Sequence, residues 1–120
     1  MRPLEQRVLS ASEYYNFSPS ALAREYLLHV VCVGDFRYAP GYDLQRDSFD
    51  SFLVEVITEG QVQIETEGEL LTACAGQVAL LDCNKPHRYS SQVGWHALWA
   101  HLDGPAAQGY FCLLYTSRCV

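Results

Sequence analysis

The chain has 120 residues, of which 49% are apolar and 18% are charged. This length supports one globular domain and is too short for two, and the apolar fraction excludes a wholly disordered chain. No stretch approaches the roughly 18 apolar residues of a membrane helix. Because residues 1–7 also lack the apolar core of a secretion signal, we expect one soluble, cytoplasmic domain with no membrane partner.

The acidic residues are concentrated in the middle of the chain. The net charge is −6, and eleven carboxylates accompany four basic residues between Asp35 and Asp103. A domain that binds nucleic acid needs a basic face, so this region is expected to bind a small molecule or another protein. The five cysteines form no Cys-x-x-Cys pair, and we expect them to be reduced thiols.

The first half of the chain begins with short elements. Ser20 is placed to cap a helical turn over residues 21–25. The apolar run 27–33 is typical of a strand, and Gly34-Asp35 is expected to end it. The dipeptide Pro40-Gly41 then marks a turn.

The centre of the chain has the clearest strand pattern. Two Glu-Gly pairs, Glu59-Gly60 and Glu67-Gly68, are interpreted as turns that separate three short strands. Further strands are predicted up to the break at Asp103-Gly104-Pro105, after which a helix begins near Ala106. Seven or eight short strands with turns between them predict an all-β fold, and we expect an antiparallel barrel. The predicted strands after residue 50 cover residues 52–58, 61–66, 69–72, 78–81, 87–89 and 95–102.

Three motifs occur in an order that resembles a known family. A glycine at Ala75-Gly76 precedes the apolar run 78–81, the tetrapeptide 86–89 reads Pro-His-Arg-Tyr, and residues 95–104 read Trp-x-x-x-Trp-x-His-Leu-Asp-Gly. This succession resembles the N-terminal cupin-type domain of AraC-type transcription regulators, notably the sugar-responsive members. The resemblance spans residues 18–111 and implies a cupin-like antiparallel barrel, or jelly roll.

The resemblance also implies that effector binding and DNA binding belong to separate domains. Residues 1–20 are otherwise unpatterned but dense in aromatic residues, so we interpret them as an N-terminal arm, with Tyr14, Tyr15 and Phe17 folding over a ligand. Residues 21–111 would bind a small-molecule effector, a mono- or disaccharide, and form a homodimer. DNA would be bound only through a C-terminal helix-turn-helix domain that this chain lacks. Residues 112–120 depart from the family pattern and are interpreted as an atypical tail that resembles translated adapter sequence, with a genuine short helix as the alternative.

The last predicted strand supplies part of the candidate ligand site. Alternation places Trp95, Ala97, Trp99 and His101 on one face. Two indoles on one face would suit a sugar, whose C–H surface packs on aromatic rings, but they would also suit a plain core. The resemblance implies a His at position 97 in the arabinose-responsive member, so Ala97 argues against arabinose itself.

The resemblance points to three sugar-contacting residues, two of which lie outside this strand. The matching positions are Arg46, Tyr89 and Trp99. The candidate ligand-binding residues also include His87, Trp95 and His101. Each has a structural alternative. Arg46 could pair in solvent with Asp43 or Asp47, Tyr89 could be a wall residue, and His87 could make a structural hydrogen bond.

The sequence predicts no metal ion, no cofactor and no catalytic residue. The segment 50–60, equivalent to the first cupin motif, has no histidine, and Cys83 with His87 would supply only two ligands. His96 and His101 should point to opposite faces of their strand. The central glutamates are expected to be solvated on hairpins: Glu55, Glu59, Glu65, Glu67 and Glu69.

We therefore expect a ligand sensor rather than an enzyme. Two alternatives remain open. The first is a stand-alone small cupin, either a carbohydrate-binding module or a metal-dependent enzyme. The second is a dimerisation domain whose own aromatic side chains fill its pocket.

Overall fold

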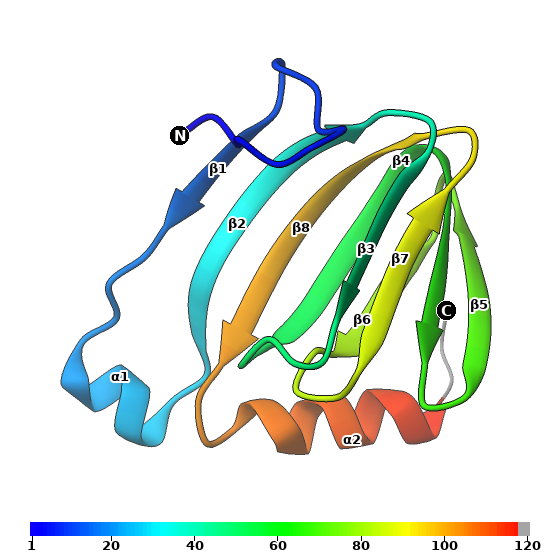
Figure 1. The fold of residues 1–120 in the computed structure, drawn as a ribbon. Coiled ribbons are helices and arrows are strands. Elements are labelled where there is room, and N and C mark those ends of the chain that lie inside the picture. Colours follow the sequence, from blue (N-terminus) through cyan, green and yellow to red (C-terminus); the bar gives the residue numbers. More distant parts are fainter. Residues whose placement is uncertain (118–120) are drawn as a thin grey trace.

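Residues 1–117 form eight strands and two helices in the computed structural model (Figure 1), and side chains are described through Leu113. Every pair of strands is antiparallel, which confirms the predicted all-β antiparallel barrel. The elements are β1 (Glu13–Asn16), α1 (Ala21–Tyr26), β2 (His29–Tyr38), β3 (Tyr42–Arg46), β4 (Phe52–Thr66), β5 (Glu69–Cys74), β6 (Val78–Asp82), β7 (His87–Ser91), β8 (Trp95–Asp103) and α2 (Ala107–Ser117).

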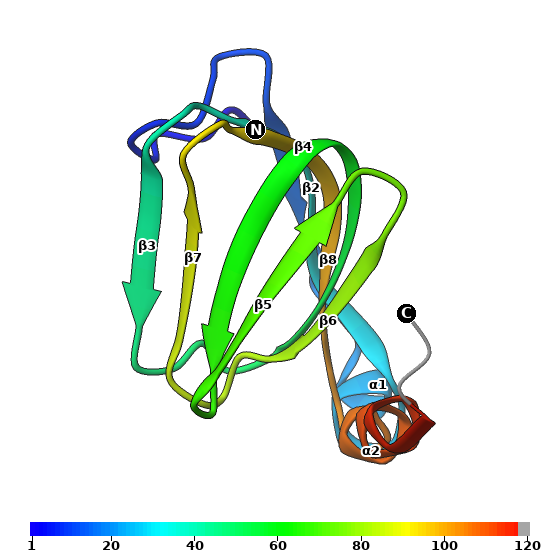
Figure 2. The same ribbon diagram turned by 90° about the vertical axis from the view of Figure 1, so that its right-hand side faces the viewer.

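Strand β4 joins the two halves of the barrel. The prediction of two strands separated by a turn at Glu59-Gly60 is wrong, because β4 is one strand of 15 residues. Its first half pairs with β6 and β8, and its second half pairs with β5 and β7 (Figure 2). The ladder with β8 shifts register between Ile57 and Glu59, and Gly60 has a φ of +72°. The Glu-Gly pair therefore bends the strand instead of ending it.

The prediction that Gly34-Asp35 ends a strand is also wrong. Strand β2 continues to Tyr38 and pairs with β8 along that length. A Cβ atom at position 34 would lie 2.2 Å from the indole of Trp99. Glycine is required here by the close approach of a side chain from the neighbouring strand, and not by a turn.

Other local predictions are confirmed. Ser20 caps α1, since its hydroxyl oxygen accepts a hydrogen bond from the backbone N–H of Ala23. Gly41 adopts a φ of +87° in the turn between β2 and β3. Glu67 and Gly68 both have positive φ and connect β4 to β5.

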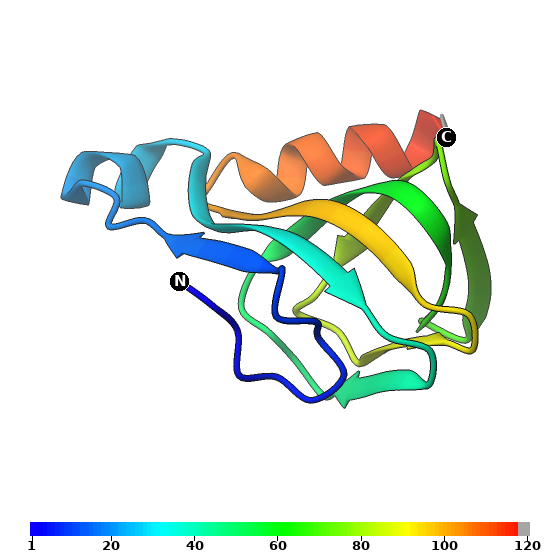
Figure 3. The same ribbon diagram turned by 90° about the horizontal axis from the view of Figure 1, so that it is seen from above.

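Helix α2 lies against the outer face of the sheet (Figure 3). The ring of Phe111 stacks on that of Phe52 with centroids 4.3 Å apart, and Ala107 is fully buried in the same cluster. The helix runs on to Ser117, through most of the segment interpreted as an atypical tail. The last part of that tail, residues 118–120, lies outside the described residues.

The N-terminal segment passes along the barrel between β2 and β3 (Figure 3). The N–H of Leu9 donates to the carbonyl of Arg37, and the N–H of Ala39 donates to the carbonyl of Arg7. The buried hydroxyl of Ser12 accepts a hydrogen bond from the N–H of Arg37 at 2.8 Å. Residues 13–16, expected in an unpatterned arm, form the edge strand β1 beside β2.

We predict that Gly60→Ala destabilises the fold more than Gly68→Ala. Both glycines have left-handed φ, which costs an L-residue about 1–2 kcal/mol. Only at position 60 would the new Cβ also meet backbone, at 2.2 Å from the carbonyl oxygen of Gly94, whereas the space at 68 is open within 4 Å. Urea unfolding of both variants measures the difference. Equal losses of unfolding free energy would contradict this account of the bend.

Candidate functional site

A cavity of about 310 Å³ lies inside the barrel. Its walls come from the inward faces of β2, β3, β4, β7 and β8, and residues 3–5 of the N-terminal segment also line it. Eight aromatic side chains contribute to the lining, together with a few polar groups, as is usual for a small-molecule site. The aromatic residues are Tyr14, Phe36, Tyr38, Tyr42, Phe49, Tyr89, Trp95 and Trp99.

Strand β8 presents the face that its alternation predicts. Trp95, Trp99 and His101 line the cavity, and Ala97 is fully buried between them. The indole N–H of Trp99 is buried and has no hydrogen-bond partner among the described residues. A buried donor without a partner costs free energy unless something satisfies it, and this one packs beside Gly34, where a Cβ would lie 2.8 Å from the indole nitrogen.

His101 is held as a neutral imidazole. Its Nδ1 and the hydroxyl of Ser51 are 2.7 Å apart and share a buried hydrogen bond. Burial, with the nearby positive charge of Arg46, lowers the pKa of His101 to about 4. At neutral pH this ring therefore brings no charge to the cavity.

Arg46 also lines the cavity, from the end of β3. Its guanidinium carbon lies 4.8 Å from the centre of the Phe49 ring. The alternative of a solvated ion pair is not observed, because Asp43 pairs instead with Arg88, at 2.9 Å from Nε to Oδ1. Among residues 1–113, Arg46 has no carboxylate within ion-pair distance. Its donors are thus available to a ligand.

Tyr89 points inward from β7 and is buried in the wall of the cavity. Its hydroxyl lies 3.4 Å from the thiol of Cys83, which is fully buried. Burial raises the pKa of Tyr89 well above its ordinary value and that of Cys83 to about 11. Both groups are therefore neutral at physiological pH.

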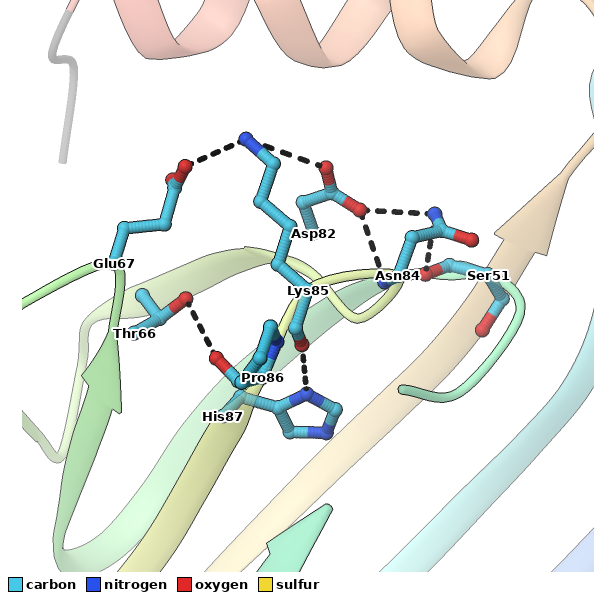
Figure 4. A network of polar contacts seen from close by, with 8 residues as sticks. All are labelled: Ser51, Thr66, Glu67, Asp82, Asn84, Lys85, Pro86 and His87. Atoms are coloured by element: carbon cyan, nitrogen blue, oxygen red, sulfur yellow. Dashed lines mark hydrogen bonds and ion pairs between the residues drawn. The ribbon is translucent and has the colours of Figure 1, made fainter. Parts of the chain in front are cut away.

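His87 is the one candidate residue that the structure places outside the cavity lining. Its Nδ1 donates to the carbonyl of Lys85 at 2.7 Å, within the polar network that Figure 4 shows. In that network, Lys85 pairs with Glu67 at 2.6 Å. The turn before β7 thus engages one ring nitrogen of His87, while its buried Nε2 has no partner among the described residues.

Glu55 is a cavity residue that the sequence analysis missed. The expectation of a solvated carboxylate is wrong here, since Glu55 is 3% exposed and lines the cavity. The indole N–H of Trp95 donates to its Oε1 at 2.9 Å. Burial raises the pKa of Glu55 to about 7. The other four glutamates of that group are exposed as expected.

An available sequence signal could have identified Glu55. Leu53, Glu55 and Ile57 alternate along one strand, and both apolar neighbours are buried in the core. Strict period-two alternation therefore places Glu55 on the inward face. The prediction of a solvated Glu55 followed the general tendency of carboxylates to stay in water instead of this pattern.

Aromatic residues of β2 and β3 complete the wall near Glu55. The rings of Tyr38 and Trp95 stack with centroids 3.7 Å apart, and Tyr42 meets both rings edge-on. The hydroxyl of Tyr42 donates to a carboxylate oxygen of Glu5 from the N-terminal segment. That segment is therefore bonded directly to the cavity wall.

The predicted arm residues divide between two environments. Tyr14 lines the cavity, with its ring 6.3 Å from that of Phe36. Tyr15 and Phe17 are both more than half exposed and do not reach the cavity. Contact with the interior is instead made by residues 3–5, which the sequence analysis did not single out.

The histidines do not form a metal centre. His96 and His101 point to opposite faces of β8 as predicted, and His96 lies beside Asp35 and Thr58 on the outer face. In the part of the chain that the structure describes, no three His, Cys, Asp or Glu residues are grouped so as to hold a metal ion. The residues present do not fit the metal site found in many cupin enzymes. None of the described helices has the length and apolar character needed to cross a membrane.

Comparison with solved structures defines the class of fold. A cupin superfamily protein from Desulfitobacterium hafniense is 16% identical with a TM-score of 0.58, and the match covers 85% of this chain and 83% of that chain. The cupin domain of an XRE-family transcriptional regulator from Enterobacter cloacae is 17% identical with a TM-score of 0.53, covering 77% and 94%. A predicted oxalate decarboxylase from Thermotoga maritima is 16% identical with a TM-score of 0.56, covering 75% and 78%. At these identities the likeness shows the fold, which is that of the cupins.

The sequence assigns the chain to one family within this fold. Residues 29–113 match the model of the AraC-like ligand-binding domain, and the chain therefore belongs to that family. No curated protein matched the chain in sequence. The family match and the ligand-sized cavity together identify a ligand-binding domain of the cupin type.

We predict that Glu55→Gln stabilises the fold in a pH-dependent way. Because burial raises the pKa of Glu55 from 4.5 to about 7, the folded state holds this proton more tightly than the unfolded state does. The stabilisation that the proton gives is full below about pH 4.5 and is lost as the pH rises through about 7. Glutamine imitates the protonated form, so its advantage over the natural chain should approach about 3 kcal/mol at pH 8 and vanish near pH 4.5.

Urea unfolding at several pH values measures this difference. His101 acts in the opposite sense, since its lowered pKa removes stability as the pH falls from about 6.5 to about 4. Because both proteins contain His101, its contribution cancels when the unfolding free energies of the variant and the natural chain are subtracted. Glu59→Gln serves as the control, because Glu59 lies exposed on the same strand. A constant difference between Glu55→Gln and the natural chain from pH 4.5 to 8 would contradict the assignment.

Proposed function

We propose that this domain senses a sugar effector for an AraC-type transcription regulator and forms a homodimer, with DNA bound by a separate C-terminal domain. The observation that supports a sugar is the combination of aromatic walls and the free guanidinium donors of Arg46 in one cavity. Arg46 supplies a fork of donors without a carboxylate partner in the described chain. Vicinal hydroxyls of a sugar match such donors, and its C–H face matches the aromatic rings.

We propose a binding role in place of a catalytic one. The cavity contains one histidine, His101, whose Nδ1 is already engaged with Ser51. The buried Cys83 is protonated, because burial raises its pKa to about 11, and its nearest polar neighbour is the neutral Tyr89. A nucleophile of this kind lacks the base that would activate it.

The mechanism we propose is a shift between positions of the N-terminal arm. Residues 3–5 line the cavity, and Glu5 is bonded to Tyr42 of its wall. A ligand that contacts both the barrel and these residues would favour one arm position, by as much as its affinities for the two arrangements differ. In the intact regulator, acting in the cytoplasm, the arm would pass this change to the dimer interface and the DNA-binding domain.

Dimerisation would use surfaces that the fold leaves apolar. The short helix α1 and the residues after it expose Leu22, Tyr26, Leu27 and Leu28. Exposed apolar clusters of this kind are typical of interaction sites. Sedimentation equilibrium measures the association state, and a chain that stays monomeric at high micromolar concentration would contradict this part of the proposal.

We predict that Arg46→Ala and Trp99→Ala each weaken the response to a sugar effector. A panel of mono- and disaccharides is titrated against tryptophan fluorescence, because both tryptophans of the chain line the cavity. Loss of a charged hydrogen-bond partner costs about 1.5–3 kcal/mol, so Arg46→Ala should weaken binding by about tenfold or more. Arg88→Ala is the matched control, since Arg88 lies on the barrel exterior in an ion pair with Asp43.

The same titration tests the alternatives. If no sugar changes the fluorescence, and both variants alter only the stability, the pocket is filled by its own aromatic side chains and serves a dimerisation domain. A chain that lacks residues 1–17 should bind the effector more weakly. Unchanged affinity after that deletion would remove the arm from the mechanism.

The regulatory part of the proposal predicts how the natural gene continues. Its reading frame, followed past the codon for Phe111, should encode roughly 150 or more further residues ending in two helix-turn-helix units. Sequencing of the source locus measures this directly. A frame that stops at the codon for Val120 would favour a stand-alone binding module.

A further inference from the structure

Glu55 has no role in the binding of a neutral sugar as described so far. Its carboxyl is buried inside the barrel and accepts one hydrogen bond, from Trp95. Within the described chain, no Lys, Arg or His nitrogen lies within 4.0 Å of it. A carboxylate taken out of water without a cationic partner is costly. Its presence in a ligand cavity points to a partner that the ligand brings.

The cavity lining carries fixed groups of both signs. Arg46 packs over Phe49, whose ring lies 4.5 Å from that of His101, so the guanidinium is near His101. In the ladder between β4 and β8, Leu53 lies opposite His101 and Glu55 lies opposite Trp99, one inward position further along. A ligand in this cavity therefore meets both a guanidinium and a carboxyl.

The groups around Glu55 suit a cation. Trp95, Tyr38 and Tyr42 form one aromatic cluster beside it, and cations are attracted to the faces of such rings. Glu5 adds a second carboxylate to the lining, bonded to Tyr42. Negative charge and aromatic rings therefore meet in the same part of the cavity.

We propose that the cavity recognises an ammonium group, and that its ligand belongs to the amino sugars or related polyhydroxylated amines. The ammonium lies against Glu55 and the aromatic cluster, and the hydroxyls lie toward Arg46. The assignment of the hydroxyl end rests on the proposed sugar-sensing function. The ammonium end rests on Glu55 and its surroundings.

The titration of Glu55 supports this arrangement. Burial raises its pKa to about 7, and an adjacent ammonium would favour the ionised form. The other groups that face it are Tyr38, Tyr42, Tyr89 and Cys83, all kept neutral by pKa values raised through burial, together with Glu5 and Arg46. Binding of a permanently charged cation should therefore strengthen as the pH rises from 6 to 8.

The test uses the two cavity tryptophans of the full chain as the fluorescent reporter. Glucosamine and glucose form one matched pair of probes, and tetramethylammonium chloride with sodium chloride forms another. We expect glucosamine to bind at least about tenfold more tightly than glucose. Glu55→Gln should remove this preference and the response to tetramethylammonium, whereas Glu59→Gln, an exposed carboxyl on the same strand, should keep both.

Each outcome separates the ammonium site from the proposed function. If glucose binds as well as glucosamine and Glu55→Gln changes neither, the ammonium inference is overturned and sugar sensing stands. If tetramethylammonium binds through Glu55 and no sugar does, the ammonium site stands and sugar sensing is contradicted. If no ammonium probe changes the fluorescence of the natural chain, the inference is overturned.

The pH dependence provides a test that needs no variant. Titration of the natural chain with tetramethylammonium at pH 6, 7 and 8 should show affinity that increases with pH. A constant affinity over that range would place the cation away from Glu55. Circular dichroism of Glu55→Gln, compared with the natural chain, establishes that the variant is folded before its binding is interpreted.

Discussion

The bend of strand β4 at Gly60 sets the geometry on which the barrel and its cavity depend. Before the bend the inward residues are Leu53, Glu55 and Ile57, and after it they are Val62, Ile64 and Thr66. The inward positions change from odd to even, because the ladder shifts by one residue between Ile57 and Glu59. Without that shift the second half of β4 would turn its apolar residues to solvent. The bulge therefore lets one strand serve both sheets and close the cavity around Glu55.

The secondary structure could largely be predicted from local patterns, and the exceptions share a physical cause. Period-two alternation and turn residues marked most strands, and Glu67-Gly68 forms the turn that its sequence indicates. Gly34 and Glu59-Gly60 carry the same turn-forming residues but lie inside strands. At Gly34 the reason is the indole of Trp99, and at Gly60 it is the backbone of Gly94. Such close approaches come from other strands, so a local pattern does not reveal them.

The residues of the candidate site could also be predicted only in part. Resemblance and alternation gave Arg46, Tyr89, Trp95, Trp99 and His101, all of which line the cavity. Tyr38 and Tyr42 join them only because β2 and β3 curl over the same interior, which is a property of topology and not of a local motif. The alternation of β4 indicated that Glu55 points inward, but the prediction followed the usual exposure of glutamates instead. The average behaviour of a carboxylate is a poor guide inside a cavity, where burial and the neighbouring side chains set its environment.

The N-terminal segment is held in a way that suits a response to ligand. Among its apolar side chains, Val8 packs partly buried against the core, whereas Leu4 is fully exposed and Met1 and Leu9 are about half exposed. The segment is also held by hydrogen bonds, including those to Arg37 and the contact between Glu5 and Tyr42. Each such bond contributes about 0.5–1.5 kcal/mol net, so these hydrogen bonds together contribute several kcal/mol. A ligand needs a difference in affinity of about that size to change the position of the segment. A ligand that competes for Tyr42 or attracts Glu5 would supply this difference, because both groups belong to the cavity that receives it.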